Sequence, residues 1–240
     1  MRKVWLLVVL CAALSLIAAS AASAQDELSC MGVPATIEGS GTIVGTSGDD
    51  VIVGSAGNDM IIGGAGNDLI CGGQGDDFII GGSGDDVLAG DDATSFGDQN
   101  APGGNDTILG GSGDDQLIGE GGNDTLDAGS GNDFATGAVG TDTVSGGAGD
   151  DEVFGGFGPD IVNGNAGDDA LFGTAGSDVL NGGSGDDFLD GDFPDANNPF
   201  ESAIDPRPNF DTCNGDSGTD ASFACEANDR VEVLLTALPG

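Results

Sequence analysis

The sequence predicts an all-β fold in which two thin parallel sheets stack into a solenoid. A nine-residue unit repeats fifteen times between residues 45 and 190. Every copy has Gly at position four, Asp at position six and an aliphatic residue at position eight. An internal repeat of this kind dictates an architecture of stacked units. One inward side chain in every nine residues is too sparse for an ordinary globular core, but it suits two thin sheets pressed together.

Each unit is predicted to form a turn followed by a short strand. Gly at positions one and four permits backbone angles closed to other residues, and Asn or Asp commonly fills position five. Side chains alternate along the last three positions, so position eight points inward while seven and nine point outward. The inward set is Ile52, Ile61, Ile70, Ile79, Leu88, Ile108, Leu117, Leu126, Ala135, Val144, Val153, Val162, Leu171, Leu180 and Leu189.

The position-six carboxylates are the candidate metal ligands. They are Asp50, Asp59, Asp68, Asp77, Asp86, Asp106, Asp115, Asp124, Asp133, Asp142, Asp151, Asp160, Asp169, Asp178 and Asp187. The chain has 42 acidic and 4 basic residues, a formal net charge of −38. Such a field excludes nucleic acid as a partner and opposes binding to anionic membranes. It also opposes compaction, so we expect folding to need a cation.

The N-terminus has the pattern of a secretory signal peptide over residues 1–24. Arg2 and Lys3 precede the apolar run Val4–Ile17, and Ala22-Ser23-Ala24 is a small-residue cleavage site. The apolar run is shorter than the ~20 residues of a membrane span, and no other stretch approaches that length. The sequence therefore predicts cleavage after Ala24 and an extracellular protein without a membrane span.

The units closely resemble a known repeat. Gly63–Cys71 reads GGAGNDLIC and Gly81–Ala89 reads GGSGDDVLA, and both are similar to the RTX (haemolysin-type) calcium-binding nonapeptide G-G-x-G-x-D-x-U-x. This resemblance implies a parallel β-roll, a β-solenoid in which two nonapeptides complete one coil. It also implies that several Ca²⁺ ions lie between a turn and the equivalent turn two units later. The Asp at position six and the carbonyls of the glycine-rich turn would be the ligands.

Elementary coordination chemistry favours the same ion. Calcium takes six to eight oxygen ligands in irregular geometry, whereas magnesium prefers compact octahedra that retain water. The chain has no His and only 5 Cys, so zinc and copper lack their usual ligands. The alternative is that the Asp residues are solvated turn formers, but turn propensity does not require an invariant position six.

The repeat defines the predicted domain organisation. Residues 25–44 form an N-terminal cap, 45–190 the β-roll, 191–214 a surface loop, and 215–240 a degenerate last repeat with a C-terminal cap. Within the caps, residues 36–44 resemble a unit without the acid. Solenoids need such caps because their end strands are otherwise unpaired.

Three details of the array depart from this regular pattern. Residues 90–100 fill eleven positions where nine are expected, and we interpret them as a bulged coil with two extra residues; a break between two rolls is the alternative. Position one loses its Gly at Ala101 and Ala128. Near the end, Gly215–Phe223 forms a worn final unit, and Val231–Leu235 is predicted as a closing strand.

Position five differs between the two edges of the C-terminal half. One edge has Thr141, Pro159 and Ser177, and the other has Asp150, Asp168 and Asp186. These departures recur every 18 residues, which supports a coil of two units. Because extra carboxylates raise the ligand charge, we expect tighter calcium sites on the Asp-rich edge.

Four cysteines remain after the signal peptide, and they allow three pairings. About eight coils at ~4.8 Å make a rod of roughly 40 Å, which keeps the two terminal pairs of cysteines apart. We therefore predict the disulfides Cys30–Cys71 and Cys213–Cys225, which export favours over free thiols.

These features predict a secreted calcium-binding protein that folds on binding several Ca²⁺ ions, and not an enzyme. Without His there is no H-E-x-x-H zinc site and no Ser-His-Asp or Cys-His pair, and the sequence has no G-x-S-x-G. A two-carboxylate glycosidase would need a pair of acids distinct from the repeat, and nothing marks one.

The alternative is a calcium-stiffened surface module that binds a protein or a glycan. Its apolar outward residues would be Val51, Val53, Met60, Ile62, Phe78 and Ile80, continued by Phe134, Phe154, Phe172 and Phe188. Such a stripe can mark a partner site, but strand propensity or cover from a cap explains it equally well. A third interpretation, a ladder of Thr107, Thr125 and Thr143 that contacts ice or sugar, is weakened by Ile161.

Overall fold

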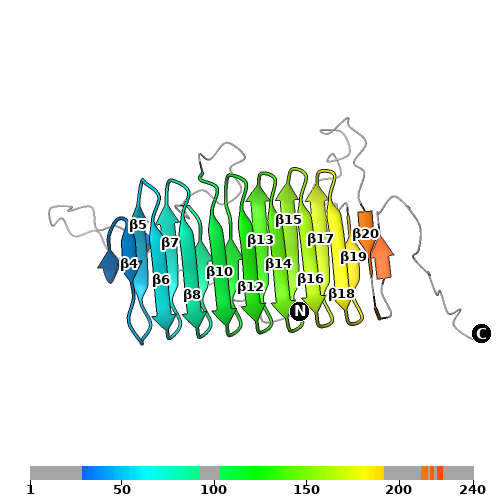
Figure 1. Cartoon of the computed structure of the whole chain (residues 1–240), viewed down its shortest axis with the longest axis horizontal. Coiled ribbons are helices and arrows are strands. Elements are labelled where there is room, and N and C mark those ends of the chain that lie inside the picture. Colours follow the sequence, from blue (N-terminus) through cyan, green and yellow to red (C-terminus); the bar gives the residue numbers. More distant parts are fainter. Residues whose placement is uncertain (1–28, 92–102, 192–211, 216, 219–220, 224–240) are drawn as a thin grey trace, which may run out of the picture.

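The computed structural model describes residues 29–91, 103–191, 212–215, 217–218 and 221–223. These residues form a straight rod of stacked strands (Figure 1). They contain no helix, and hence none that is long and apolar enough to cross a membrane. The predicted all-β parallel β-roll is confirmed.

Two parallel sheets build the rod. The nine-stranded sheet contains β4 (Thr42–Val44), β6 (Met60–Ala65), β8 (Phe78–Ser83), β10 (Thr107–Ser112), β12 (Thr125–Ser130), β14 (Thr143–Ala148), β16 (Ile161–Ala166), β18 (Val179–Ser184) and β20 (Thr212–Asn214). The ten-stranded sheet contains β3 (Ile37–Glu38), β5 (Val51–Ser55), β7 (Leu69–Gly73), β9 (Val87–Ala89), β11 (Gln116–Ile118), β13 (Phe134–Val139), β15 (Glu152–Phe157), β17 (Ala170–Ala175), β19 (Phe188–Asp190) and β21 (Ala221–Phe223). Consecutive strands alternate between the sheets, so two units complete one coil.

The core is the single column of position-eight side chains. All fifteen are at most 1% exposed and form one continuous cluster. Ile43 extends this cluster at the N-terminal end, and Ile37 and Cys213 pack against it. The buried column confirms the inward direction expected from strand alternation.

The glycines of the turns are required because neighbouring coils stack backbone against backbone. A Cβ atom on Gly81 would lie 2.8 Å from the Gly110 carbonyl oxygen, and one on Gly66 would lie 2.7 Å from the carbonyl carbon of Gly48. Gly66 also has φ of +104°, which side chains rarely adopt. The turns therefore stack as closely as the strands do.

The roll is continuous across the irregular segment at 90–100. Paired residues of β8 and β10 are 29 positions apart in the sequence, whereas those of β10 and β12 are the regular 18 positions apart. Gly90 stacks on Gly119, since a Cβ on Gly90 would lie 2.7 Å from the Gly119 carbonyl oxygen, as at other position-one glycines. Gly90 is therefore position one of the unit that ends in β10.

The interpretation of 90–100 as a bulged coil with two extra residues is thus corrected, and the pairing across it also argues against the alternative of a break between two rolls. The unit from Gly90 to Leu109 has eleven residues more than the regular nine, and they add no coil unit. Position one of this unit is not lost, because Gly90 holds it instead of Ala101. Ala101 itself lies outside the described residues, whereas Ala128 is fully buried at its own position one.

Residues 191–214 contain a further unit that the repeat pattern did not reveal. Strand β20 pairs with β18 in register, with Cys213 opposite Leu180. Gly191 occupies position one of this unit. Its carbonyl oxygen lies against Gly173, the position-one glycine of the preceding coil, and the Gly173 carbonyl oxygen lies against Gly155 in the same way. The interpretation of 191–214 as a surface loop alone is therefore corrected. Strand β21, at the end of the predicted final unit 215–223, pairs in register with β19.

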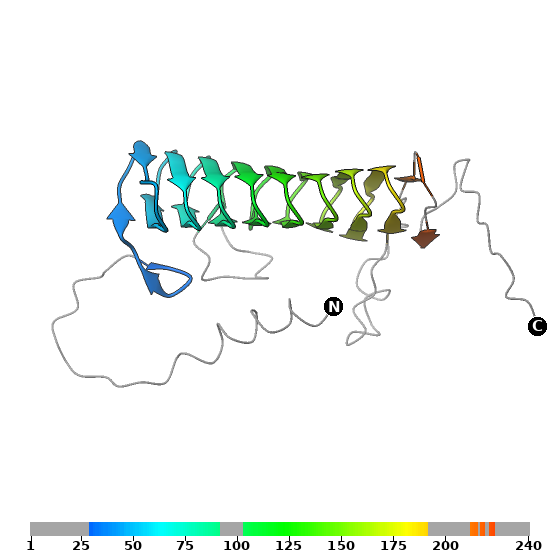
Figure 2. The same ribbon diagram turned by 90° about the horizontal axis from the view of Figure 1, so that it is seen from below.

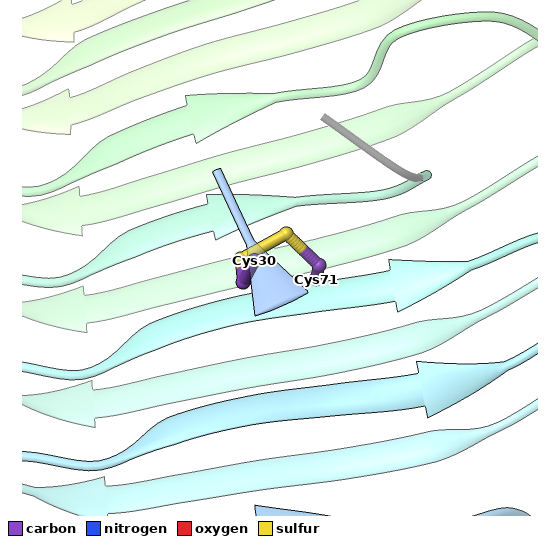
Figure 3. Close-up of a disulfide and its surroundings, with 2 residues drawn as sticks. All are labelled: Cys30 and Cys71. Atoms are coloured by element: carbon purple, nitrogen blue, oxygen red, sulfur yellow. A yellow bond between two sulfur atoms is a disulfide. The ribbon is translucent and has the colours of Figure 1, made fainter. Parts of the chain in front are cut away.

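An N-terminal hairpin covers part of the ten-stranded sheet. Strands β1 (Ser29–Cys30) and β2 (Val33–Pro34) are antiparallel, and β1 contacts β5 and β7. Figure 2 shows the hairpin lying outside the rod, alongside its first coils. The predicted disulfide Cys30–Cys71 fastens it to β7, with its two Cα atoms 5.6 Å apart (Figure 3). Cys213 is also disulfide-bonded, and its predicted partner, Cys225, lies outside the described residues.

The outward apolar residues do not form one stripe. Val51 and Val53 belong to the ten-stranded sheet, where the hairpin buries Val53 together with Cys71 and Ala89. Met60, Ile62, Phe78 and Ile80 belong to the nine-stranded sheet, where Met60 is 45% exposed. The four later phenylalanines stack on the ten-stranded sheet in the order Phe134, Phe154, Phe172 and Phe188, with ring centroids 4.6–5.8 Å apart.

The outer face of the nine-stranded sheet also carries polar rows. Thr107, Thr125 and Thr143 are paired in register, as expected, and Ile161 follows them. An amide ladder runs beside this row, in which Asn214 donates to Asn181 and Asn181 to Asn163, each at 2.8 Å.

Candidate metal centre

The turns form two columns, one along each edge of the roll. We call the turns that lead into the ten-stranded sheet the ten-strand edge; its position-six residues are Asp50, Asp68, Asp86, Asp115, Asp133, Asp151, Asp169 and Asp187. The turns that lead into the nine-stranded sheet form the nine-strand edge, with Asp59, Asp77, Asp106, Asp124, Asp142, Asp160 and Asp178. The structure therefore brings the sequence-predicted residues together as two rows.

All fifteen carboxylates are buried, with exposed fractions of 0–8%. Along each row, the backbone N–H of one Asp donates to Oδ1 of the equivalent Asp in the next coil. The Asp50 N–H donates to Asp68 Oδ1 at 2.9 Å, and the Asp115 N–H donates to Asp133 Oδ1 at 2.7 Å. Thus Oδ1 joins neighbouring coils and fixes the direction of each side chain.

The second carboxylate oxygen has no such role in most turns. Oδ2 is buried without a hydrogen-bond partner in Asp68, Asp77, Asp86, Asp106, Asp115, Asp124, Asp133, Asp142, Asp151, Asp160 and Asp169. A buried polar atom without a partner costs about 1–3 kcal/mol, and more when it is charged. Buried charges in proteins are paired or coordinate metals. A regular row of such oxygens is therefore the arrangement expected of cation ligands.

Burial also makes these carboxyl groups hard to ionise without a cation. Desolvation, together with neighbouring carboxylates, raises the pKa of Asp106 and of Asp160 to about 8. Desolvation also raises the pKa to about 7 for Asp77, Asp115, Asp124 and Asp151 and to about 6 for Asp86, Asp142 and Asp169. A cation at this position would supply the attraction that the bare site lacks.

Carbonyl oxygens accompany the carboxylates. A Cβ on Gly119 would lie 2.5 Å from Asp124 Oδ2 and 2.7 Å from the carbonyl oxygen of Gly137 in the next coil. Carboxylate and carbonyl oxygens of neighbouring turns therefore converge beside the glycines. In the part of the chain that the structure describes, no three His, Cys, Asp or Glu side chains come together. Carbonyls must therefore complete any coordination shell, and the flexible oxygen shell of calcium fits this set.

The first turn on each edge is different. Asp50 Oδ2 accepts hydrogen bonds from the N–H and Oγ1 of Thr46, at 2.7 and 2.9 Å. Asp59 Oδ2 accepts the N–H of Ser55 at 2.6 Å, and Asp59 Oδ1 accepts the N–H of Gly41. These two turns are closed by their own hydrogen bonds.

Position five forms an outer row of unequal length on the two edges. On the ten-strand edge, the backbone N–H of each position-five residue donates to the position-five side chain of the preceding coil. This row begins with the N–H of Asn67, which donates to Asp49, and ends with the N–H of Asp186, which donates to Asp168. On the nine-strand edge, the row reaches the N–H of Thr141, which donates to Asn123. Pro159 has no N–H to continue it.

Two buried acids were not found by the repeat pattern. Asp91 and Glu120 are each 5% exposed, although neither is at position six. Asp91 follows Gly90 and accepts the N–H groups of Gly104 and Gly121, at 3.1 and 3.3 Å. Recognising Gly90 as position one is the signal that would have found Asp91.

The comparison with known protein families agrees with this geometry. A sequence model of the RTX calcium-binding nonapeptide repeat (4 copies) matches residues 37–70, 72–94, 103–135, 127–162, 136–171 and 163–193. No curated protein matches the sequence. The matched segments cover more than half of the chain and include both columns of buried aspartates. The chain therefore belongs to the family of RTX calcium-binding nonapeptide repeat proteins.

Proposed function

We propose that this chain is a secreted calcium-binding protein whose roll folds as several Ca²⁺ ions bind between successive turns. The observation that carries the proposal is the double row of buried carboxylates, in which the Oδ2 atoms of the eleven from Asp68 to Asp169 lack hydrogen-bond partners. Each ion would be held by position-six Asp residues of stacked turns and by the carbonyls of their glycines. The role of the ion would be to neutralise the carboxylates and to bridge neighbouring coils, in keeping with the match to a calcium-binding repeat.

Folding and binding would be one equilibrium. The carboxylates of a row meet only when coils stack, so the unfolded chain has no preformed site. Without cations, stacking would bring buried like charges together in a chain with a net charge of −38. We therefore expect the roll to be largely unfolded in chelator and folded at the millimolar calcium levels typical of extracellular modules.

Circular dichroism of the mature protein, residues 25–240, tests this proposal. The spectrum is expected to be that of a mainly disordered chain in chelator and to become β-rich on addition of calcium. Magnesium at the same concentration is the control for general screening, and we expect it to be much less effective. A β-rich spectrum that is unchanged by chelator would contradict coupled folding.

A calcium-stiffened interaction module is the second candidate. It is favoured by the outer face of the nine-stranded sheet, where Val44 is 60% and Met60 is 45% exposed. This face differs from the opposite one, where the hairpin already buries Val53 and Cys71. Capture of a protein or glycan in calcium, lost in a Met60→Ser variant that still binds calcium, would support this function. Unchanged capture would exclude this face.

A further inference from the structure

We propose that the first turn of each edge, residues 45–50 and 54–59, binds no calcium and forms an ion-independent coil on which the calcium-bound coils assemble. Asp50 and Asp59 then serve as structural caps of the two rows, and the first calcium ligands are Asp68 and Asp77. This inference rests on the proposed calcium-binding function, and it states at which turns of the roll calcium binding begins.

The hydrogen bonds of Asp50 carry the first part of the argument. Its Oδ2 atom already accepts both the N–H and the hydroxyl of Thr46. The Thr46 Oγ1 atom in turn accepts the N–H of Gly48 at 3.2 Å. In the equivalent turn of the next coil, position two is Gly64, which has no hydroxyl, and Asp68 Oδ2 is buried without a hydrogen-bond partner.

Asp59 shows the same closure on the other edge. Its two oxygens are taken by the N–H groups of Ser55 and Gly41, and Ser55 Oγ accepts the N–H of Gly57 at 3.2 Å. Gly41 holds the place of a position-six residue in the acid-free unit at 36–44. An ion at Asp59 would have to displace these hydrogen bonds, whereas an ion at Asp77 Oδ2 would displace none.

The backbone of the first turns is an independent observation. In the second turns, positions two and four are left-handed, with φ of +120° and +104° at Gly64 and Gly66. The corresponding φ values at Gly73 and Gly75 are +108° and +109°. Positions two and four of the first turns are Thr46, Gly48, Ser55 and Gly57, and none of them lies in the left-handed region. The backbone of the first turns therefore does not repeat the conformation of the second turns.

Other contacts support the first coil without ions. The disulfide Cys30–Cys71 ties the hairpin to β7, and the hairpin buries the outer face of β5 at Val53. Inside the roll, Ile52, Ile61 and Ile70 are fully buried. In chelator the disulfide still holds the hairpin against β5 and β7, and the first coil keeps its apolar contacts on two sides. It offers the next turns an edge that is already in register.

Native mass spectrometry of two matched variants tests the limit of the array. Asp50→Asn and Asp68→Asn remove one charge at the same position of adjacent coils on the ten-strand edge. At saturating calcium, Asp68→Asn is expected to lose at least one bound ion, and Asp50→Asn is expected to keep the wild-type number. An equal loss in both variants would overturn the proposal. A wild-type protein that binds no calcium would instead refute the proposed function.

Hydrogen exchange tests the ion-independent coil. In chelator, amides of β5 and β6 are expected to exchange at least tenfold more slowly than those of β14 and β16. A Thr46→Val variant removes the hydroxyl without touching the carboxylate. It should exchange faster over residues 45–55 while keeping the wild-type number of ions. Equally fast exchange in all four strands, or loss of an ion in Thr46→Val, would refute the idea.

Discussion

The two edges of the roll are built from the same repeat, but they differ in regularity. The ten-strand edge has Asp or Asn at position five in every turn from Asp49 to Asp186. The nine-strand edge loses this pattern after Asn123 and also accommodates both insertions, after Gly90 and after Gly191. Position six stays Asp on both edges, so the inner row tolerates less change than the outer one. The difference indicates that the buried carboxylate is the essential part of each turn.

Acid should have the largest effect, because it acts on both edges at once. In calcium-stripped protein, burial raises the folded-state pKa of the eleven position-six carboxyls from Asp68 to Asp169 above 3.8, to about 8 for Asp106 and Asp160. The folded state then holds more protons than the unfolded state, so this contribution to stability is present below about pH 4 and is lost as pH rises through 6–8. We expect calcium-free protein to gain β-structure on acidification, measured by circular dichroism.

Calcium should reverse that dependence. Ligating carboxylates must be deprotonated, so calcium affinity is expected to rise with pH over the range in which the folded-state groups titrate. Titration at a series of pH values checks the sign. An affinity that is independent of pH between 5 and 8 would contradict the assignment of these carboxyls as ligands.

The next effect compares the edges directly. Asp169→Asn on the ten-strand edge should weaken calcium binding by about tenfold, or ~1.4 kcal/mol. Asp142→Asn on the nine-strand edge should cost less, because Thr141 and Pro159 add no charge beside it, whereas Asp150 and Asp168 flank the Asp169 row. Calorimetric titration measures both affinities. A larger loss of calcium affinity in Asp142→Asn than in Asp169→Asn would contradict the proposal that the ten-strand edge binds calcium more tightly.

Repairing the outer row should have the smallest effect. The double variant Thr141→Asn, Pro159→Asn restores a side-chain acceptor and an N–H donor on the nine-strand edge. One added hydrogen bond should stabilise the calcium-bound roll by about 0.5–1.5 kcal/mol. Thermal unfolding in calcium measures it, and Ser177→Ala is a control in the same column. No gain would mean that the outer row contributes little to either edge.

The sequence was sufficient for the parts of the fold that repeat locally. Position eight, the two-unit coil and the disulfide Cys30–Cys71 follow from periodicity and from the length of the rod. The unit containing β20 escaped notice because its inward residue is Cys213 and its turn is interrupted after Gly191. Gly90 was missed because its partner in space, Asp106, is 16 residues away instead of five.

The candidate site was predicted less completely than the fold. All fifteen Asp residues look alike in the sequence, yet Asp50 and Asp59 differ in hydrogen bonding from the eleven between Asp68 and Asp169. That difference depends on the backbone angles of Thr46 and Ser55, which the nine-residue pattern does not specify. The use of a given carboxylate therefore depends on its turn, as well as on its place in the repeat.

The insertion after Gly90 has a practical consequence. Eleven added residues leave the pairing of β8 with β10 and of β9 with β11 in register. This unit is therefore a natural graft point, at which a foreign peptide can replace residues 92–102 between two fixed anchors. A roll carrying such grafts along one edge would display them in a line, with a spacing set by the strands.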